Sequence, residues 1–300
     1  MHAWKTVVLS GGALRGFALL GSLQALYDRG KLVSAQKYIG TSIGAIIGYL
    51  LCIGYTPVEI MVYLCQEKCI EYISSQIDVI HSFSGKGMLP FSPIRSILET
   101  MTLRKSEVLL TLKALRDHYG KQLVCCTYNY TRGELEFLDD QSHPHLGCLE
   151  ALQMSSSLPF LFEPFCYQNC LYLDGALISN FPLFHTSSLS DIPILGIRFR
   201  KTKRGNPCFV QEESSSSSTI LEFCYQLLTI PTDFMDQLLN DPLRSNCSLI
   251  EIDLSDCDHF FNFHLSNTHR FDMFSRGYES SLLFLESSSR QDGQSQIYHV

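Results

Sequence analysis

The sequence predicts an α/β protein whose mostly parallel central sheet is flanked by helices. Residues 6–10 are apolar and β-rich, the glycine pair Gly11-Gly12 follows, and apolar residues recur at helical spacing from Phe17 to Tyr27. A second strand, turn and helix unit is read from "KYIGTSIGAIIGYLLCIG", residues 37–54, with its strand ending near Ile39. Two successive units of this kind imply parallel strands with helices covering both faces of the sheet.

The middle of the chain continues the alternation. Residues 56–119 are mostly helical in pattern, with a Gly, Ser and Pro break at "HSFSGKGMLPFSP". "QLVCCTYNYTRGELEFLDD" predicts two strands joined by a turn at residues 131–133. A helix at 146–156, an extended segment at 157–165 and a strand with its turn in "CLYLDGALISNFPL" are expected next.

The C-terminal third predicts fewer elements. We expect strands at 192–200 and 248–254, helices at 219–240 and 268–286, and a polar loop at 201–219 that includes Ser214 to Ser218. The residues after 286 are expected to fray. We therefore predict one domain over residues 1–290, with the motif-bearing core at 5–200, a C-terminal part at 201–290 and a disordered tail at 291–300.

Composition excludes several classes of protein. The net charge of −7, from 23 basic and 30 acidic residues, argues against a dedicated nucleic-acid binder, which needs a basic face. The 12 cysteines are scattered through apolar segments and predict buried, reduced thiols; none sits in a convincing zinc pattern, so no metal site is expected. Neither a signal peptide nor an apolar stretch of ~18 residues is found, which favours a cytoplasmic protein, at most peripheral at a membrane.

The second turn carries a candidate nucleophile. Gly40-Thr41-Ser42-Ile43-Gly44 is a G-x-S-x-G motif between a strand and a helix. Small flanking residues allow the sharp bend that exposes a serine hydroxyl at the start of a helix. The alternative is an ordinary helix cap, for which serine is also preferred. The motif alone does not separate these two interpretations.

Asp174 is the candidate base for that serine. None of the ten histidines lies in a setting that singles it out. Asp174 instead ends a strand and is followed at once by Gly175 and Ala176, an arrangement that can aim a carboxylate into a site. Partial desolvation would raise its pKa into the working range of a base. The alternative is a plain turn residue, since Asp-Gly is a common turn pair.

The first glycine turn has a sequence suited to binding an anion through its backbone N–H groups. "GGALRG", residues 11–16, lacks the G-x-G-x-x-G spacing of a dinucleotide site and the Lys-Ser/Thr of a P-loop. The small residues Gly11, Gly12 and Ala13 leave consecutive N–H groups accessible, which favours an oxyanion hole.

These three motifs, in this order, resemble those of the patatin-like phospholipases. "GGALRG" is similar to the family's oxyanion motif, "GTSIG" to its nucleophile motif and "DGA" at 174–176 to its aspartate motif. The flanking stretches "SSSLPFLFEP" and "DGALISNFPL" extend the resemblance over about residues 5–200. The resemblance implies a three-layer patatin-like fold.

The resemblance also implies roles for individual residues. Ser42 would attack an ester carbonyl, Asp174 would take its proton, and the N–H groups of Gly11, Gly12 and Ala13 would hold the oxyanion. Arg15 matches a basic position of the family that orients the loop or meets phosphate, and the supporting motif positions are Gly16, Gly40, Gly44, Gly175 and Ala176. Members of this kind work without calcium, so no cofactor is expected. Ala13 stands where the commoner motif has a glycine, and its methyl group calls for a negative φ.

The predicted function is that of a lipid acyl hydrolase acting on phospholipid or related acyl esters, with transient contact at a membrane surface. Residues 56–119, around "IHSFSGKGMLPF", are the candidate mobile cover, with a packed helical flank as the alternative. An acyltransferase of the same fold shares the nucleophile chemistry and stays open. A catalytically silent lipid-binding protein is the third hypothesis, which labelling by a fluorophosphonate would test.

Overall fold

The fold was analysed in a computed structural model of the 300-residue chain. The structure describes residues 3–66, 90–186, 189, 191–200, 227–239 apart from 229, 233 and 237, 246–254 and 266–295. The predicted break at 81–93 lies mostly outside these residues. The predicted serine-rich loop at 201–219 lies wholly outside them.

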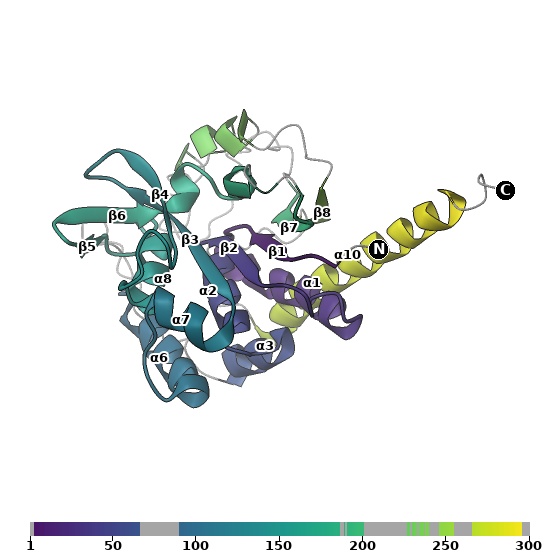
Figure 1. Ribbon diagram of the computed structural model, residues 1–300, viewed down its shortest axis with the longest axis horizontal. Helices are drawn as coiled ribbons and strands as arrows, with labels where there is room; N and C mark the ends of the chain where they lie inside the picture. The colour runs from purple at the N-terminus through teal and green to yellow at the C-terminus, as the bar shows by residue number, and fades with distance from the viewer. Residues whose placement is uncertain are drawn as a thin grey trace, which may run out of the picture.

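An eight-stranded sheet forms the centre of the molecule (Figure 1). Its five parallel strands lie in the order β3-β2-β1-β7-β8, and β6, β5 and β4 add antiparallel pairing at the β3 side. The strands are β1 Thr6–Leu9, β2 Lys37–Thr41, β3 Gln122–Asn129, β4 Glu134–Leu138, β5 Phe165–Tyr167, β6 Cys170–Asp174, β7 Ile194–Phe199 and β8 Cys247–Ile252. The predicted mostly parallel α/β sheet is confirmed.

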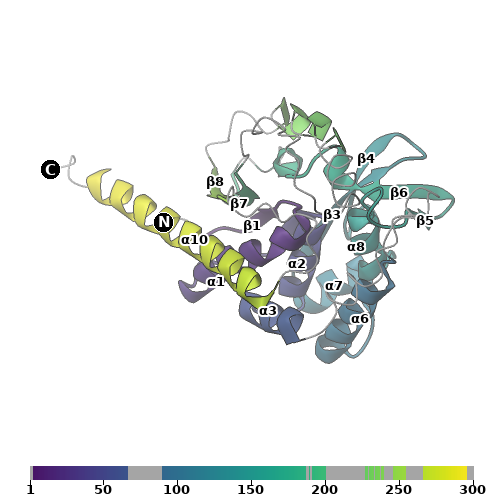
Figure 2. The ribbon, with the colours of Figure 1, turned by 180° about the vertical axis from the view of Figure 1, so that it is seen from behind.

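Helices cover one face of this sheet and line the side on which the site is found (Figures 1 and 2). They are α1 Gly16–Asp28, α2 Ile43–Cys52, α3 Pro57–Gln66, α6 Ser92–Ser106, α7 Leu112–Tyr119, α8 Cys148–Ser156 and α10 Asn267–Ser295. Three short 3-10 turns are also present: η1 Ala13–Arg15, η2 Gly175–Leu177 and η3 Leu183–Thr186. The described residues of 227–239 are helical as well. Within the predicted helical stretch 56–119, the described residues thus form three separate helices.

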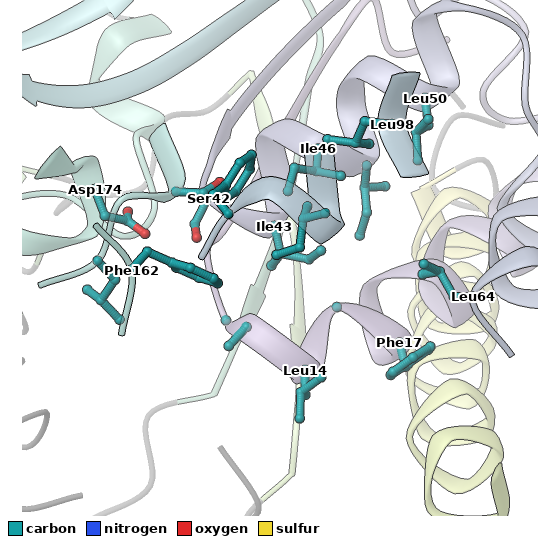
Figure 3. Close-up of a pocket in the computed structure, with 18 of the residues that line it drawn as sticks. Leu14, Phe17, Ser42, Ile43, Ile46, Leu50, Leu64, Leu98, Phe162 and Asp174 are labelled. Atoms are coloured by element: carbon teal, nitrogen blue, oxygen red, sulfur yellow. The ribbon is translucent and has the colours of Figure 1, made fainter. Parts of the chain in front are cut away.

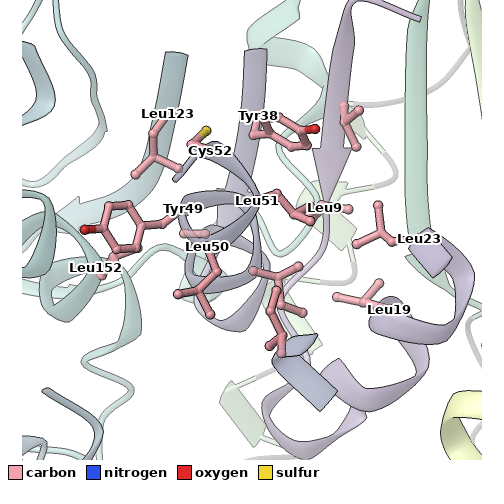
Figure 4. Packing of buried hydrophobic residues seen from close by; sticks show 14 of the residues in the cluster. Leu9, Leu19, Leu23, Tyr38, Tyr49, Leu50, Leu51, Cys52, Leu123 and Leu152 are labelled. Atoms are coloured by element: carbon pink, nitrogen blue, oxygen red, sulfur yellow. The ribbon is translucent and has the colours of Figure 1, made fainter. Parts of the chain in front are cut away.

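Alternating side chains of the strands fill two cores. Val7 and Leu9 of β1 point to the face covered by α1 and α2 and belong to the larger core, which also contains Leu19 of α1 and Tyr49 of α2 (Figure 4). Val8, between them, belongs to a second cluster on the opposite face. That cluster contains Ile39, Val124, Phe181, Leu183 and Ile194, so the chain after β6 covers the other face. The result is the three-layer arrangement that the sequence predicts.

The C-terminal helix α10 packs along α1 at very short range. A Cβ at Gly21 would lie 1.8 Å from the Phe274 carbonyl oxygen, and one at Gly277 would lie 1.9 Å from that of Ala18. Only glycine permits this approach. The helix runs to Ser295, past the predicted end at residue 286, and its last turns project beyond the body of the molecule (Figure 2). The frayed segment expected after 286 is therefore helical up to 295, because no proline interrupts the backbone ladder there.

Candidate active site

Ser42 lies on a strained corner between β2 and α2. Its backbone has φ 55° and ψ −124°, a conformation that L-residues avoid. The Ser42 N–H donates to Ser155 Oγ at 3.0 Å, and Ser155 Oγ donates to the Cys126 carbonyl at 2.6 Å. The Ser42 side chain makes no capping hydrogen bond to α2. The plain-cap alternative therefore does not account for this serine, whose hydroxyl is left to face the cavity.

The two glycines of the motif make the corner possible. A Cβ on Gly40 would lie 2.4 Å from the Ala45 nitrogen, and one on Gly44 would lie 2.6 Å from the Leu9 carbonyl oxygen. Both contacts are with backbone atoms, which cannot move aside. The motif thus packs α2 directly against the ends of β1 and β2 and fixes Ser42 at their carboxyl edge.

Asp174, at the end of β6, is 1% exposed and faces Ser42 (Figure 3). Its Oδ1 accepts the N–H of Ala176 at 2.8 Å, as in an Asp-Gly turn. Desolvation raises the pKa of Asp174 from 3.8 to about 7, although the Ala176 N–H and the nearby Ser42 hydroxyl act in the opposite direction. The turn alternative therefore describes part of the local structure, and the carboxyl group still holds a pKa suited to a base.

The turn after Asp174 is held from two sides. A Cβ on Gly175 would lie 2.5 Å from the Cys126 carbonyl oxygen, so this residue packs against β3. On the other side, Thr232 Oγ1 hydrogen-bonds the carbonyls of Ala176 and Leu177 at 2.9 and 2.8 Å. Thr232 belongs to residues 227–239, which are helical wherever they are described.

The glycine loop presents two N–H groups rather than three. The Gly11 N–H donates to the Asn180 carbonyl at 2.9 Å, and Asn180 Nδ2 donates to the Gly11 carbonyl at 3.2 Å. The prediction of Gly11 as an oxyanion donor is therefore wrong, because the Gly11 N–H is already hydrogen-bonded to the Asn180 carbonyl. In the part of the chain that the structure describes, the N–H groups of Gly12 and Ala13 have no such partner.

Ala13 adopts φ 46°, inside the left-handed region. The expectation of a negative φ at this position is also wrong. The start of η1 and the short turn from Gly12 impose the conformation, since the Arg15 N–H donates to the Gly12 carbonyl at 2.9 Å. A non-glycine residue in this region costs about 1–2 kcal/mol. The loop therefore stores strain beside Ser42.

Arg15 and Gly16 hold the loop in place. The Arg15 guanidinium lies 5.5 Å from the centre of the Phe199 ring, and that ring occupies the space a Cβ on Gly12 would need, 2.4 Å away. A Cβ on Gly16 would lie 2.4 Å from Ile43 Cγ1. Arg15 thus packs against the ring that borders Gly12, and its two expected roles stay predictions. Gly16 brings the loop against Ile43, the first residue of α2.

An apolar pocket of about 170 Å³ opens on Ser42 and Asp174 (Figure 3). Its walls come from α1, α2, α3 and α6, with Phe17, Ile46, Leu64 and Leu98 among the lining side chains. The described parts of the candidate cover, residues 56–66 and 90–119, therefore supply walls of the pocket. The polar side chains among the described lining residues are those of Ser42, Ser156, Asp174 and Asn180.

Three contributors to the site were missed from the sequence. Ser155 hydrogen-bonds the Ser42 corner from 113 residues away, Asn180 hydrogen-bonds the glycine loop, and Thr232 hydrogen-bonds the turn after Asp174. Ser155 and Asn180 stand in the quoted stretches "SSSLPFLFEP" and "DGALISNFPL", but nothing in their spacing distinguishes them. Thr232 has no sequence signal at all.

The described cysteines are all free thiols, and Cys166 is the exposed one among them. Over the same part of the chain, no group of three or more His, Cys, Asp or Glu residues is arranged to hold a metal ion. Nor does any single described helix have the length and apolar composition to cross a membrane; α2 and α3, bent by 117°, meet that test only when taken together.

This fold and this site define an α/β protein in which a serine corner, a buried carboxyl group and a glycine loop surround an apolar pocket. Residues 7–186 match the sequence profile of the Patatin-like phospholipase family. The chain belongs to that family, which confirms the resemblance drawn from its motifs.

Two curated relatives show how far the likeness extends. "Probable lipid hydrolase 463L" of Invertebrate iridescent virus 6 is 35% identical over 184 residues, which span 60% of this chain and 62% of the viral protein. "Uncharacterized protein YqhO" of Bacillus subtilis (strain 168) is 29% identical over 222 residues, 67% of this chain and 72% of that protein. The chain thus spans less than two thirds of the length of the viral relative.

Solved structures share the fold at low identity. VipD from Legionella pneumophila matches with a TM-score of 0.54 at 17% identity, over 95% of this chain and 67% of that one. ExoU, in its heterodimeric complex with SpcU from the type III secretion system of Pseudomonas aeruginosa, matches with a TM-score of 0.53 at 15% identity, over 95% and 52%. Both matches confirm the patatin-like fold.

Proposed function

We propose that this protein hydrolyses acyl esters of phospholipids or related lipids through an acyl-enzyme on Ser42. The observation that carries the proposal is the pairing of Ser42 with a buried carboxyl group, Asp174, whose pKa is about 7. A base with a pKa near the working pH combines a sufficient ionised fraction with sufficient basicity. The viral relative, called a probable lipid hydrolase, supports the same substrate class.

The proposed reaction begins with Ser42. Its Oγ attacks the ester carbonyl carbon while its proton passes to the Asp174 carboxylate. Negative charge on the carbonyl oxygen is held by the N–H groups of Gly12 and Ala13, and one such donor contributes roughly 3–4 kcal/mol to the transition state in other hydrolases. Protonated Asp174 then gives its proton to the leaving alkoxide, and the acyl group remains on Ser42.

A water molecule completes the cycle. Asp174 takes one proton from the water, the oxygen attacks the acyl carbon, and the fatty acid leaves as Ser42 recovers its proton. The apolar pocket beside Ser42 would hold the acyl chain, since its lining offers hydrocarbon contacts in place of water. Because one carboxyl group supplies both proton transfers, we expect no requirement for calcium. We also expect only transient contact with the lipid surface.

A lipid panel tests this proposal. Purified protein should release fatty acid from phospholipid vesicles and from a soluble short-chain ester, with and without a chelator. Ser42→Ala and Asp174→Asn should each abolish the release, while their unfolding transitions show that they are folded. Product analysis with an added alcohol would detect acyl transfer. Undiminished release by folded Ser42→Ala protein would refute the assignment of the nucleophile.

A further inference from the structure

Ser156 carries a buried hydroxyl group to which the proposed reaction assigns no role. The residue is 3% exposed and lines the pocket that contains Ser42 and Asp174. Among the residues that the structure describes, its Oγ has no hydrogen-bond partner. An unpaired buried hydroxyl is costly, and such groups in native proteins usually meet a water molecule or a ligand.

The two neighbours of Ser156 tie its segment of the chain to the backbone of both reacting residues. Ser155 Oγ accepts the N–H of Ser42 at 3.0 Å, and the Ser157 carbonyl accepts the N–H of Asp174 at 2.9 Å. The Ser157 hydroxyl is itself used, since it donates to the Gln153 carbonyl at 2.8 Å. Of the three consecutive serines, two are tied to the protein and the middle one opens on the cavity.

The roles of the other polar groups leave one reacting oxygen that the Ser156 hydroxyl could bind. The ester carbonyl oxygen is assigned to the glycine loop, and Asn180 is engaged with the Gly11 peptide. The leaving oxygen and, later, the oxygen of water must lie where Asp174 can reach them. The chain at Ser156 and Ser157 runs beside Asp174, on the side of the site joined to the Asp174 backbone.

We propose that the Ser156 hydroxyl binds the oxygen atom that exchanges its proton with Asp174. In acylation this is the leaving alkoxide oxygen, and in deacylation it is the oxygen of the attacking water. Ser156 transfers no proton: each proton passes between Ser42, Asp174 and that oxygen, and Ser156 only hydrogen-bonds the oxygen and orients it. The inference rests on the proposed function.

The test separates acylation from deacylation. A p-nitrophenyl ester releases a leaving group that needs no proton, so Ser156→Ala should still give a burst of p-nitrophenolate. The steady turnover after the burst should fall at least about tenfold, which corresponds to about 1.4 kcal/mol. Fluorophosphonate labelling of Ser42, which involves neither oxygen, should stay within about twofold of the wild-type rate.

Thermal unfolding gives an independent measurement. Removing an unpaired buried hydroxyl should leave the melting temperature of Ser156→Ala unchanged or raised. The matched control is Ser22→Ala, because Ser22 Oγ is equally buried but shares a 2.6 Å hydrogen bond with Ser281 Oγ. Ser22→Ala should melt at a lower temperature and keep the wild-type ratio of turnover to labelling.

Three results would overturn the inference. The first is wild-type turnover by Ser156→Ala, the second is a loss of labelling equal to the loss of turnover, and the third is a lowered melting temperature of this variant. Failure of the proposed function looks different, because the wild-type protein itself would then show neither labelling of Ser42 nor ester turnover.

Discussion

Asp174 makes the stability of the protein depend on pH in a way that one substitution can expose. Its carboxyl group is 1% exposed, and burial raises its pKa from 3.8 to about 7. Between these two values the folded protein holds a proton that the unfolded chain has released. The stabilisation from this group is therefore complete below pH 3.8 and is lost as the pH rises through 7.

The magnitude follows from the size of the shift. Each unit of pKa difference is worth about 1.4 kcal/mol, so a shift of about 3 units corresponds to about 4 kcal/mol in total. Asp174→Asn removes the titration and keeps the shape of the side chain, with an oxygen left to accept the Ala176 N–H. Between pH 5 and pH 8, the free energy of unfolding of the variant should rise relative to wild type by about 3 kcal/mol.

Urea unfolding at several pH values measures this difference. Other titrating groups are common to both proteins and largely cancel, so the pH dependence of the difference reports on Asp174 alone. The same variant should lose at least about a thousandfold in kcat/KM, and wild-type kcat/KM should rise with pH to a plateau above an apparent pKa near 7. A difference in stability that stays constant from pH 5 to pH 8 would show that Asp174 is not a buried, protonated acid.

Three further predictions follow from the geometry of the site. Ala13→Gly should raise the free energy of unfolding by up to about 1 kcal/mol and keep the activity, because it relieves the strain at φ 46°; a less stable variant, in thermal unfolding, would contradict that strain. Ser155→Ala removes the hydrogen bonds to the Ser42 N–H and to the Cys126 carbonyl, so it should destabilise the protein by about 2–3 kcal/mol and lower kcat, as urea unfolding and ester turnover would show; unchanged stability and turnover would rule out this support. In native protein, iodoacetamide should modify the exposed Cys166 before Cys126, because burial raises the pKa of the Cys126 thiol; peptide mapping that finds Cys126 first would contradict its burial.

Much of the fold could be predicted because its signals are local. Apolar strands followed by glycine turns predicted the β1 and β2 units, and α2, Ile43–Cys52, lies inside the second unit expected at residues 37–54. The sharp bend at Ser42 could also be predicted, because small residues flank the serine between a strand and a helix and allow that bend. The end of α10 was not, because serine-rich residues have weak helix preference yet follow an established helix.

The finer details of the site depend on distant contacts. Gly11 was expected to donate to an oxyanion, but its partner Asn180 lies 169 residues away in the chain. The burial that raises the pKa of Asp174 is likewise a property of the assembled layers and not of the "DGA" motif. Ala13 takes a positive φ because the turn into η1 imposes it, against the preference of its own side chain.

The most direct test of the central claim is mass spectrometry of protein treated with a fluorophosphonate, read together with lipid hydrolysis in the same preparation. We predict a single stoichiometric adduct on the peptide that contains Ser42, a parallel loss of fatty-acid release, and neither in Ser42→Ala. An adduct on another residue, or hydrolysis that persists after Ser42 is fully modified, would contradict the account.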